Sequence, residues 1–104
     1  MIEQVNSLEK FLTIIEERTP MYLGGRTIVH LKAFLDGWFF GKEDEIKDSH
    51  LLSEFQEWLQ KKYQINSTQS WAQIILFYSM DEFAALDRFF LLFKEFLRQK
   101  ANNE

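Results

Sequence analysis

Apolar residues recur along this chain at the spacing of amphipathic helices. In residues 2–18 they stand three or four positions apart, which places them on one helical face. This stripe consists of Val5, Leu8, Phe11, Leu12, Ile14 and Ile15. Thr19-Pro20 is expected to end the helix because proline disfavours helical geometry in the residue before it. Gly24-Gly25 then permits a sharp reversal of the chain.

A second helix is predicted from Thr27, a favourable N-cap residue, to about Phe40. Its apolar stripe consists of Ile28, Leu31, Leu35 and Trp38. Gly37 costs roughly 1 kcal/mol relative to alanine at such a position. It therefore indicates either close packing of a neighbouring helix or a local loosening. Gly41 is the expected stop, and a charged linker follows it.

A third helix is predicted to open at Asp48 or Ser49 and to run to about Tyr63. Its apolar face consists of Leu51, Leu52, Phe55, Trp58 and Leu59. Lys61 and Lys62 fall in its last turn, where positive charge suits the negative end of the helix dipole.

A capping-box pattern predicts a fourth helix. Ser70 and Gln73 have the required spacing, so this helix should begin at Trp71. The run 74–78 would also suit a buried strand. Because no second strand-like segment is present to pair with it, a helix is favoured.

Ser79 and Glu82 repeat the capping-box pattern and predict a last helix at about 80–100. Its apolar residues form two stripes, which suits a central helix that is contacted on two sides. They are Phe83, Leu86, Phe90, Phe93 and Leu97 in one stripe, and Phe89, Leu92 and Phe96 in the other. The fold class predicted for residues 1–104 is therefore a single all-α domain, a compact bundle of about five helices.

The negative charge is concentrated in residues 36–57. This segment has seven acids and two bases, a local net charge of −5, whereas the whole chain has −4. Its acids are Asp36, Glu43, Asp44, Glu45, Asp48, Glu54 and Glu57. Such a segment is either a solvated linker between helices or a docking surface for a basic protein.

Three large aromatic residues, Trp38-Phe39-Phe40, stand beside these acids. Consecutive helix positions point about 100° apart, so the three rings cannot all face one core. At least one is expected to be exposed and available as a partner-binding anchor. The predicted partner-binding residues are Asp36, Trp38, Phe40, Glu43, Asp44, Glu45 and Asp48.

Composition argues against several other classes of protein. The chain has no cysteine, and with a pI near 5.2 it lacks the basic character of nucleic-acid-binding proteins. No secretory signal or membrane-spanning run is apparent, which favours a cytoplasmic protein. No cofactor motif or paired catalytic carboxylates are found. His30 is expected to be partly buried and His50 to be a neutral surface group, so neither catalysis nor a metal site is predicted.

Two segments, YLGGRTIVHLKAFLDGWFFG (22–41) and SWAQIILFYSMDEFAALDRFFLLFKEF (70–96), carry a family resemblance. They resemble small bacterial immunity proteins that protect against polymorphic or contact-dependent growth-inhibition toxins. The two segments cover 47 of the 104 residues. The resemblance implies a non-catalytic protein that neutralises a cognate toxin, expected to be a basic nuclease, by blocking its active site or substrate path. The alternative is a helical adaptor or regulatory subunit that binds a partner helix or itself.

Overall fold

The structure is a computed structural model that describes residues 7–18, 26–40, 45–66 and 69–102. Within these ranges it contains five helices and no strand, so the all-α prediction is confirmed. The helices are α1 (Leu8–Glu17), α3 (Ile28–Phe39), α4 (His50–Lys62), α5 (Trp71–Phe77) and α6 (Glu82–Asn102). The predicted helix stops at Thr19-Pro20 and Gly41, and the reversal at Gly24-Gly25, lie outside the described residues.

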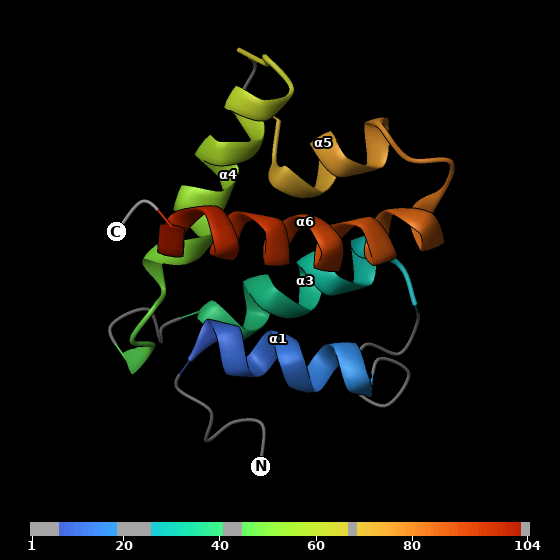
Figure 1. The fold of residues 1–104 in the computed structure, drawn as a ribbon. Coiled ribbons are helices and arrows are strands. Elements are labelled where there is room, and N and C mark those ends of the chain that lie inside the picture. Colours follow the sequence, from blue (N-terminus) through green and yellow to red (C-terminus); the bar gives the residue numbers. More distant parts are fainter. Residues whose placement is uncertain (1–6, 19–25, 41–44, 67–68, 103–104) are drawn as a thin grey trace.

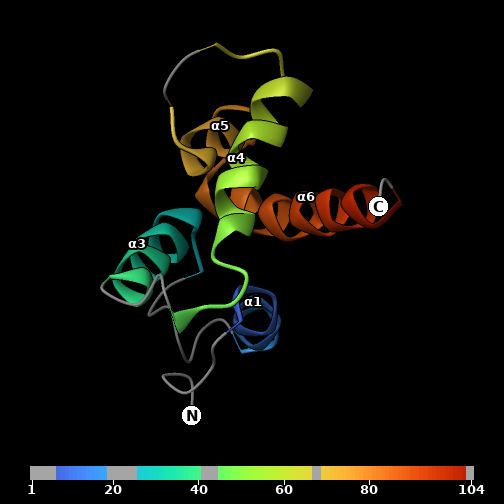
Figure 2. The same ribbon diagram turned by 90° about the vertical axis from the view of Figure 1, so that its left-hand side faces the viewer.

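The C-terminal helix α6 is central, as predicted. It crosses between α4 and α5 on one side and α1 and α3 on the other (Figure 1), and the turned view separates the same pairs (Figure 2). Its buried residues are Ala85, Leu86, Phe89, Phe90, Leu92, Phe93 and Phe96. One member of the predicted stripe is wrong, because Phe83 is 58% exposed. The buried residues of α6 therefore begin at Ala85, at the end of its first turn.

Phe55 of α4 is the hub of the aromatic core. Its side chain is fully buried, and its ring contacts five others at centroid distances of 5.1–6.4 Å. These rings belong to Trp58, Trp71, Phe89, Phe93 and Phe96. The tilted and edge-on pairs suit the ring quadrupoles and add to the hydrophobic gain of burial. One side chain therefore joins α4, α5 and α6.

A second aromatic contact joins α1 to α3. Phe11 is fully buried, and its ring stacks on Trp38 at 3.9 Å and lies 5.6 Å from Phe34.

Ion pairs then tie α6 to its neighbours at the surface. Lys100 lies 2.7 Å from Glu54 of α4, and this hydrogen-bonded ammonium lowers the pKa of the Glu54 carboxyl.

Two of the three predicted N-caps are confirmed. Thr27 Oγ1 accepts from the His30 N–H at 3.2 Å, and Ser70 and Gln73 form the reciprocal capping box. The box predicted from Ser79 and Glu82 is wrong.

Ser79 is engaged by the preceding helix instead, because its hydroxyl donates to the Ile75 carbonyl at 2.7 Å. Asp81 takes its place and accepts from the Ala84 N–H at 2.8 Å. Helix α6 consequently begins at Glu82 rather than Met80.

Replacement of the aromatic hub tests this core. Phe55→Ala removes a fully buried ring at which three helices meet. The substitution should lower the free energy of unfolding by about 3–5 kcal/mol. The measurement is urea denaturation followed by circular dichroism. Phe83→Ala is the matched control, since this ring is mostly exposed and its loss should cost less than about 0.5 kcal/mol. Equal costs for the two variants would contradict the assigned core.

Candidate functional site

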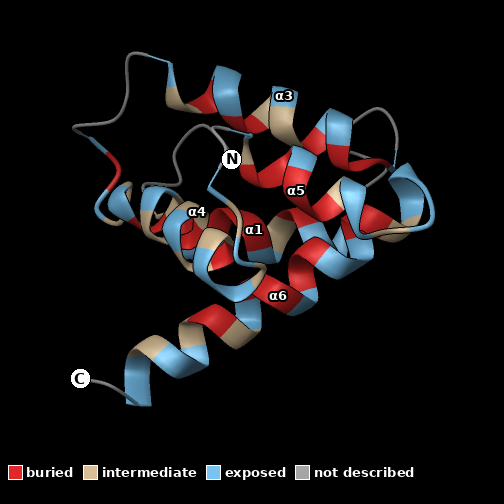
Figure 3. Cartoon of the chain, turned by 90° about the horizontal axis from the view of Figure 1, so that it is seen from above, coloured by how far each residue is buried: buried red, intermediate tan, exposed pale blue. Residues whose placement is uncertain are grey.

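The side of α3 opposite its buried stripe is exposed and consists mostly of apolar or small residues. Exposed positions follow this side of the helix (Figure 3), and they recur at helical spacing. We call this set the outer face of α3: Val29, Ala33, Asp36, Gly37 and Phe40. The opposite face is buried through Ile28, Leu31, Leu35 and Trp38. A helix that is apolar on both faces is usually covered on both, and here only one is covered.

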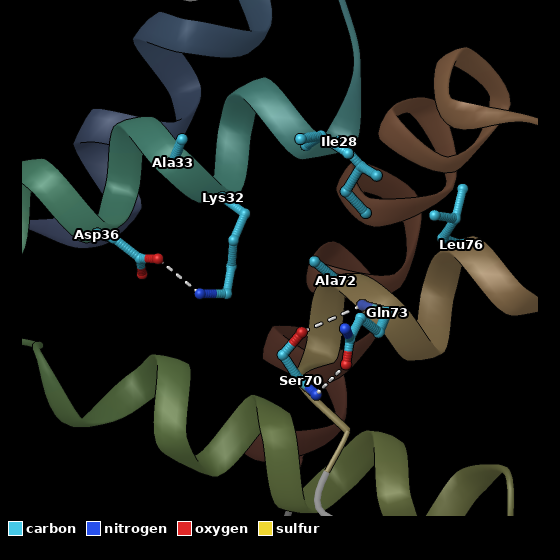
Figure 4. Close-up of a pocket in the computed structure, with 9 residues that line it drawn as sticks. Ile28, Lys32, Ala33, Asp36, Ser70, Ala72, Gln73 and Leu76 are labelled. Carbon is cyan, nitrogen blue, oxygen red and sulfur yellow. Dashed lines mark hydrogen bonds and ion pairs between the residues drawn. The ribbon is translucent and has the colours of Figure 1, made fainter.

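A groove runs between α3 and α5, and Val29, Ala33 and Asp36 of the outer face line its α3 side. Its volume is about 510 Å³, and its lining is mostly aliphatic with polar groups at its rim (Figure 4). Lys32 and Asp36 form an ion pair at 2.6 Å on the α3 side, and the Ser70–Gln73 capping box lies on the α5 side. The ion pair neutralises its own charge, so the groove offers an apolar surface bounded by hydrogen-bonding groups.

Gly37 leaves an open space in the middle of this face. A Cβ atom placed on it would have no neighbouring atom within 4 Å, and α3 continues through Gly37 to Phe39. Neither predicted cause of this glycine is therefore correct, since no helix of the described chain packs on it and the helix does not loosen. What remains is a site where another molecule could approach the backbone of α3 closely.

The aromatic triplet divides between core and surface. Trp38 is only 8% exposed and is held by its stacking on Phe11, whereas Phe40 is 85% exposed. Phe39 is half-buried against Trp38. The expectation that at least one ring is exposed is confirmed for Phe40. Trp38 must be corrected as a candidate anchor, because the core of this chain already occupies its ring.

The predicted acidic residues do not behave as one group. Asp36 is exposed but paired with Lys32, and Glu45 is exposed. Glu43 and Asp44 lie outside the described residues. Two of the described acids that were named as partner-binding residues, Asp36 and Glu45, are therefore at the surface. Both lie within five residues of Phe40 in the sequence. The fifth predicted acid, Asp48, has a structural role.

Asp48 caps the N-terminus of α1 across a sequence separation of about forty residues. Its Oδ1 accepts from the Leu8 N–H at 2.6 Å, and its Oδ2 accepts from the Glu9 N–H and the Ser7 hydroxyl, both at 3.1 Å. The helix N-terminus presents free N–H groups and partial positive charge, so a carboxylate is favourable there. Asp48 is therefore corrected as a partner-binding residue, because its acceptor oxygens are already engaged.

The same contact corrects one predicted helix boundary, the start of α1, and decides between the two residues predicted to open α4. Ser7 is an extended N-cap residue whose Oγ accepts from the Lys10 N–H, so α1 begins at Leu8 and not at residue 2. At α4 the N-cap position is Ser49, which makes no side-chain capping bond. Asp48, the other residue expected to open α4, serves α1 instead.

The histidines are separate surface groups. His30 is exposed rather than partly buried, and its Nδ1 lies 2.6 Å from Thr27 Oγ1. His50 is exposed as expected, and its Nε2 lies 3.4 Å from Glu54. Across the described ranges, no three His, Cys, Asp or Glu side chains gather so that they could hold a metal ion.

Comparisons of the chain with protein-family models, with curated proteins and with solved structures gave no match. The resemblance to immunity proteins therefore stays a prediction. In the described part of the chain, no helix combines the length and apolarity needed to span a bilayer.

Sequence reasoning missed Val29, Ala33 and the role of Gly37 in the outer face of α3. The available signal was that these residues, with Phe40, lie opposite the buried stripe and are themselves apolar or small. That pattern indicates a helix with two apolar faces.

Loss of the Asp48 carboxylate should destabilise the fold. Asp48→Ala leaves the Leu8 and Glu9 amides without their acceptor and should lower the free energy of unfolding by about 1–2 kcal/mol. Native-state hydrogen exchange of these two amides should accelerate. Glu45→Ala is the control, since this exposed acid removes the same charge and should leave both measurements nearly unchanged. Matching losses in the two variants would contradict a capping role for Asp48.

Proposed function

We propose that this protein binds a cognate bacterial toxin, a basic nuclease, and neutralises it through the outer face of α3. The observation that carries the proposal is an uncovered apolar helix face that ends in the 85% exposed Phe40 ring beside acidic residues. Binding there would block the active site or the path of the nucleic-acid substrate. The protein acts in this proposal as an inhibitor and not as a catalyst.

The outer face supplies the two kinds of contact that a tight inhibitor needs. Phe40 is a rigid aromatic side chain that can fill a pocket on the toxin, as the dominant residues of protein interfaces do. Ala33 and Gly37 lack bulk and let a partner approach the α3 backbone, which increases the contact area around this anchor. Both features favour a protein partner over a small-molecule substrate.

The charge of the adjoining segment supports a basic partner. Residues 36–57 have a local net charge of −5, which exceeds the net charge of −4 for the whole chain. A nuclease that grips phosphate groups is basic at its active site, and complementary charges accelerate encounter between proteins. The resemblance of residues 22–41, which include α3, to immunity proteins supports the same assignment.

Gly37→Gln separates stability from binding. Replacement of a helical glycine by a good helix former, into open space, should raise the free energy of unfolding by about 0.5–1 kcal/mol. The new side chain should at the same time weaken toxin affinity at least tenfold, measured by calorimetry, because it fills the approach to the outer face. Thr13→Gln places the same side chain at an exposed position of α1 and should leave affinity unchanged. Unaltered affinity of the folded Gly37→Gln variant would place the toxin elsewhere.

Replacement of Glu43, Asp44 and Glu45 together by Ser should act on the rate of association. Charges at the rim of an interface steer encounter, so association should slow and lose much of its salt dependence while dissociation changes little. Stopped-flow mixing at several ionic strengths measures both. If the triple variant associates like the parent at low salt, the acids do not steer the toxin.

If the parent binds no toxin encoded beside its gene, the immunity proposal fails and a helical adaptor replaces it.

A further inference from the structure

Exposed apolar side chains gather at the turn between α5 and α6. Among the described residues, seven large hydrophobic side chains are exposed, and four of them fall within residues 77–83. Phe77, Met80 and Phe83 are 74%, 95% and 58% exposed, and we call these three residues the apolar tip. Scattered exposed hydrophobic residues are ordinary, but a local group of this size indicates an interaction site.

The turn that carries the tip is internally fixed. Tyr78, the fourth exposed residue, stacks on Tyr63 at the end of α4 with ring centroids 4.4 Å apart. The Tyr78 N–H donates to the Ile75 carbonyl at 3.2 Å, and the Ser79 N–H donates to the Leu76 carbonyl at 3.1 Å. A surface that is ordered before binding loses less entropy on association, so this turn is suited to hold a partner.

The charged residues nearest the tip in sequence are acidic. Between Lys62 and Arg88 the chain contains no lysine or arginine, but it contains Asp81, Glu82 and Asp87. Asp87 is paired with Arg26 at 2.6 Å, and no ion pair of the described residues involves Asp81 or Glu82. The tip is therefore an apolar surface with two acids beside it that no ion pair of the described chain neutralises. Glu82 is one, and the other is Asp81, whose Oδ1 accepts from the Ala84 N–H at the start of α6.

We propose that the apolar tip is a second protein-binding surface, and that its occupant is an amphipathic helix whose apolar face is flanked by Lys or Arg. Charge complementarity selects this partner, because basic side chains would pair with Asp81 and Glu82 as the apolar face covers Phe77, Met80 and Phe83. A symmetric contact with a second copy would bring two sets of these acids together. An anionic lipid surface would repel them.

The apolar tip shares no residue with the outer face of α3, and it lies at the opposite end of α3 from the Phe40 anchor. Val29, at the beginning of α3, lines the same groove as Leu76 and is the part of the outer face nearest the tip. In the groove, Ile28 and Leu76 lie at the same end (Figure 4), so the end of α5 lies beside the beginning of α3. Phe40 follows the other end of α3, a helix of twelve residues that is about 18 Å long. The inference therefore goes beyond the proposed inhibition, and each surface can be tested without the other.

The test uses the full chain and two synthetic helical peptides of about 18 residues, roughly five turns. One has a leucine face flanked by lysines, and the other has glutamates in place of the lysines. The lysine peptide should bind and shift the NMR signals of residues 77–83, whereas the glutamate peptide should bind at least tenfold more weakly.

The variant Phe77→Ser, Met80→Ser, Phe83→Ser should bind the lysine peptide at least tenfold more weakly than the parent. It keeps every charge, so a loss of affinity reports the apolar contact alone. Leu91→Ser is the control: it replaces one apolar side chain that is 68% exposed on α6 and outside the tip, and it should bind like the parent.

Four results would overturn the proposal. Equal affinity of the parent for both peptides would remove the charge argument, and equal affinity of the parent and the triple variant for the lysine peptide would remove the tip. Dimerisation in the ultracentrifuge that the triple variant abolishes would make a second copy the occupant. Binding to anionic phosphatidylserine vesicles that the same variant abolishes would make a membrane the occupant. None of these results bears on the proposal that the outer face of α3 binds a toxin, which is tested separately.

Discussion

The packing of Phe55 against the aromatic face of α6 is the contact on which the remaining arrangement depends. It joins α4, α5 and α6 through one fully buried side chain, and α6 then provides a second apolar side for α3. Helices as short as the seven-residue α5 are not stable alone, so their positions follow from this packing. Both candidate surfaces are thereby fixed at the periphery of one core.

The helices themselves could largely be predicted because their signals are local. Stripes at 3-4 spacing and the Ser70–Gln73 box depend on residues within a turn or two of each other. The two failures have different causes. Asp48 caps α1 from forty residues away, and no local pattern contains that contact. At α6 the competition is local, because Ser79 donates to Ile75 four residues earlier and Asp81 caps the helix three residues before Ala84.

The candidate site was predictable only in part for the same reason. The crowding of Trp38-Phe39-Phe40 required one exposed ring, but the identity of that ring depends on where Phe11 lies in the fold. The local charge predicted a binding surface within residues 36–57. The outer face of α3, in contrast, is defined by the residues of that helix that remain exposed after the other helices have packed. An exposed apolar residue such as Val29 cannot be told from a core residue until the neighbouring helices are placed.

The capping of α1 by Asp48 has a consequence for how the chain acquires its structure. A carboxylate and a helix terminus forty residues apart can meet only after the intervening chain has closed, and that closure costs entropy before the contact repays it. The first turn of α1 is therefore expected to form late, after α3 has docked. The amino-terminal helix and the acidic segment are in this sense one kinetic unit. Removal of α1 would leave the Asp48 carboxylate without the amides that it now accepts from, and would add one uncompensated charge to the acidic segment.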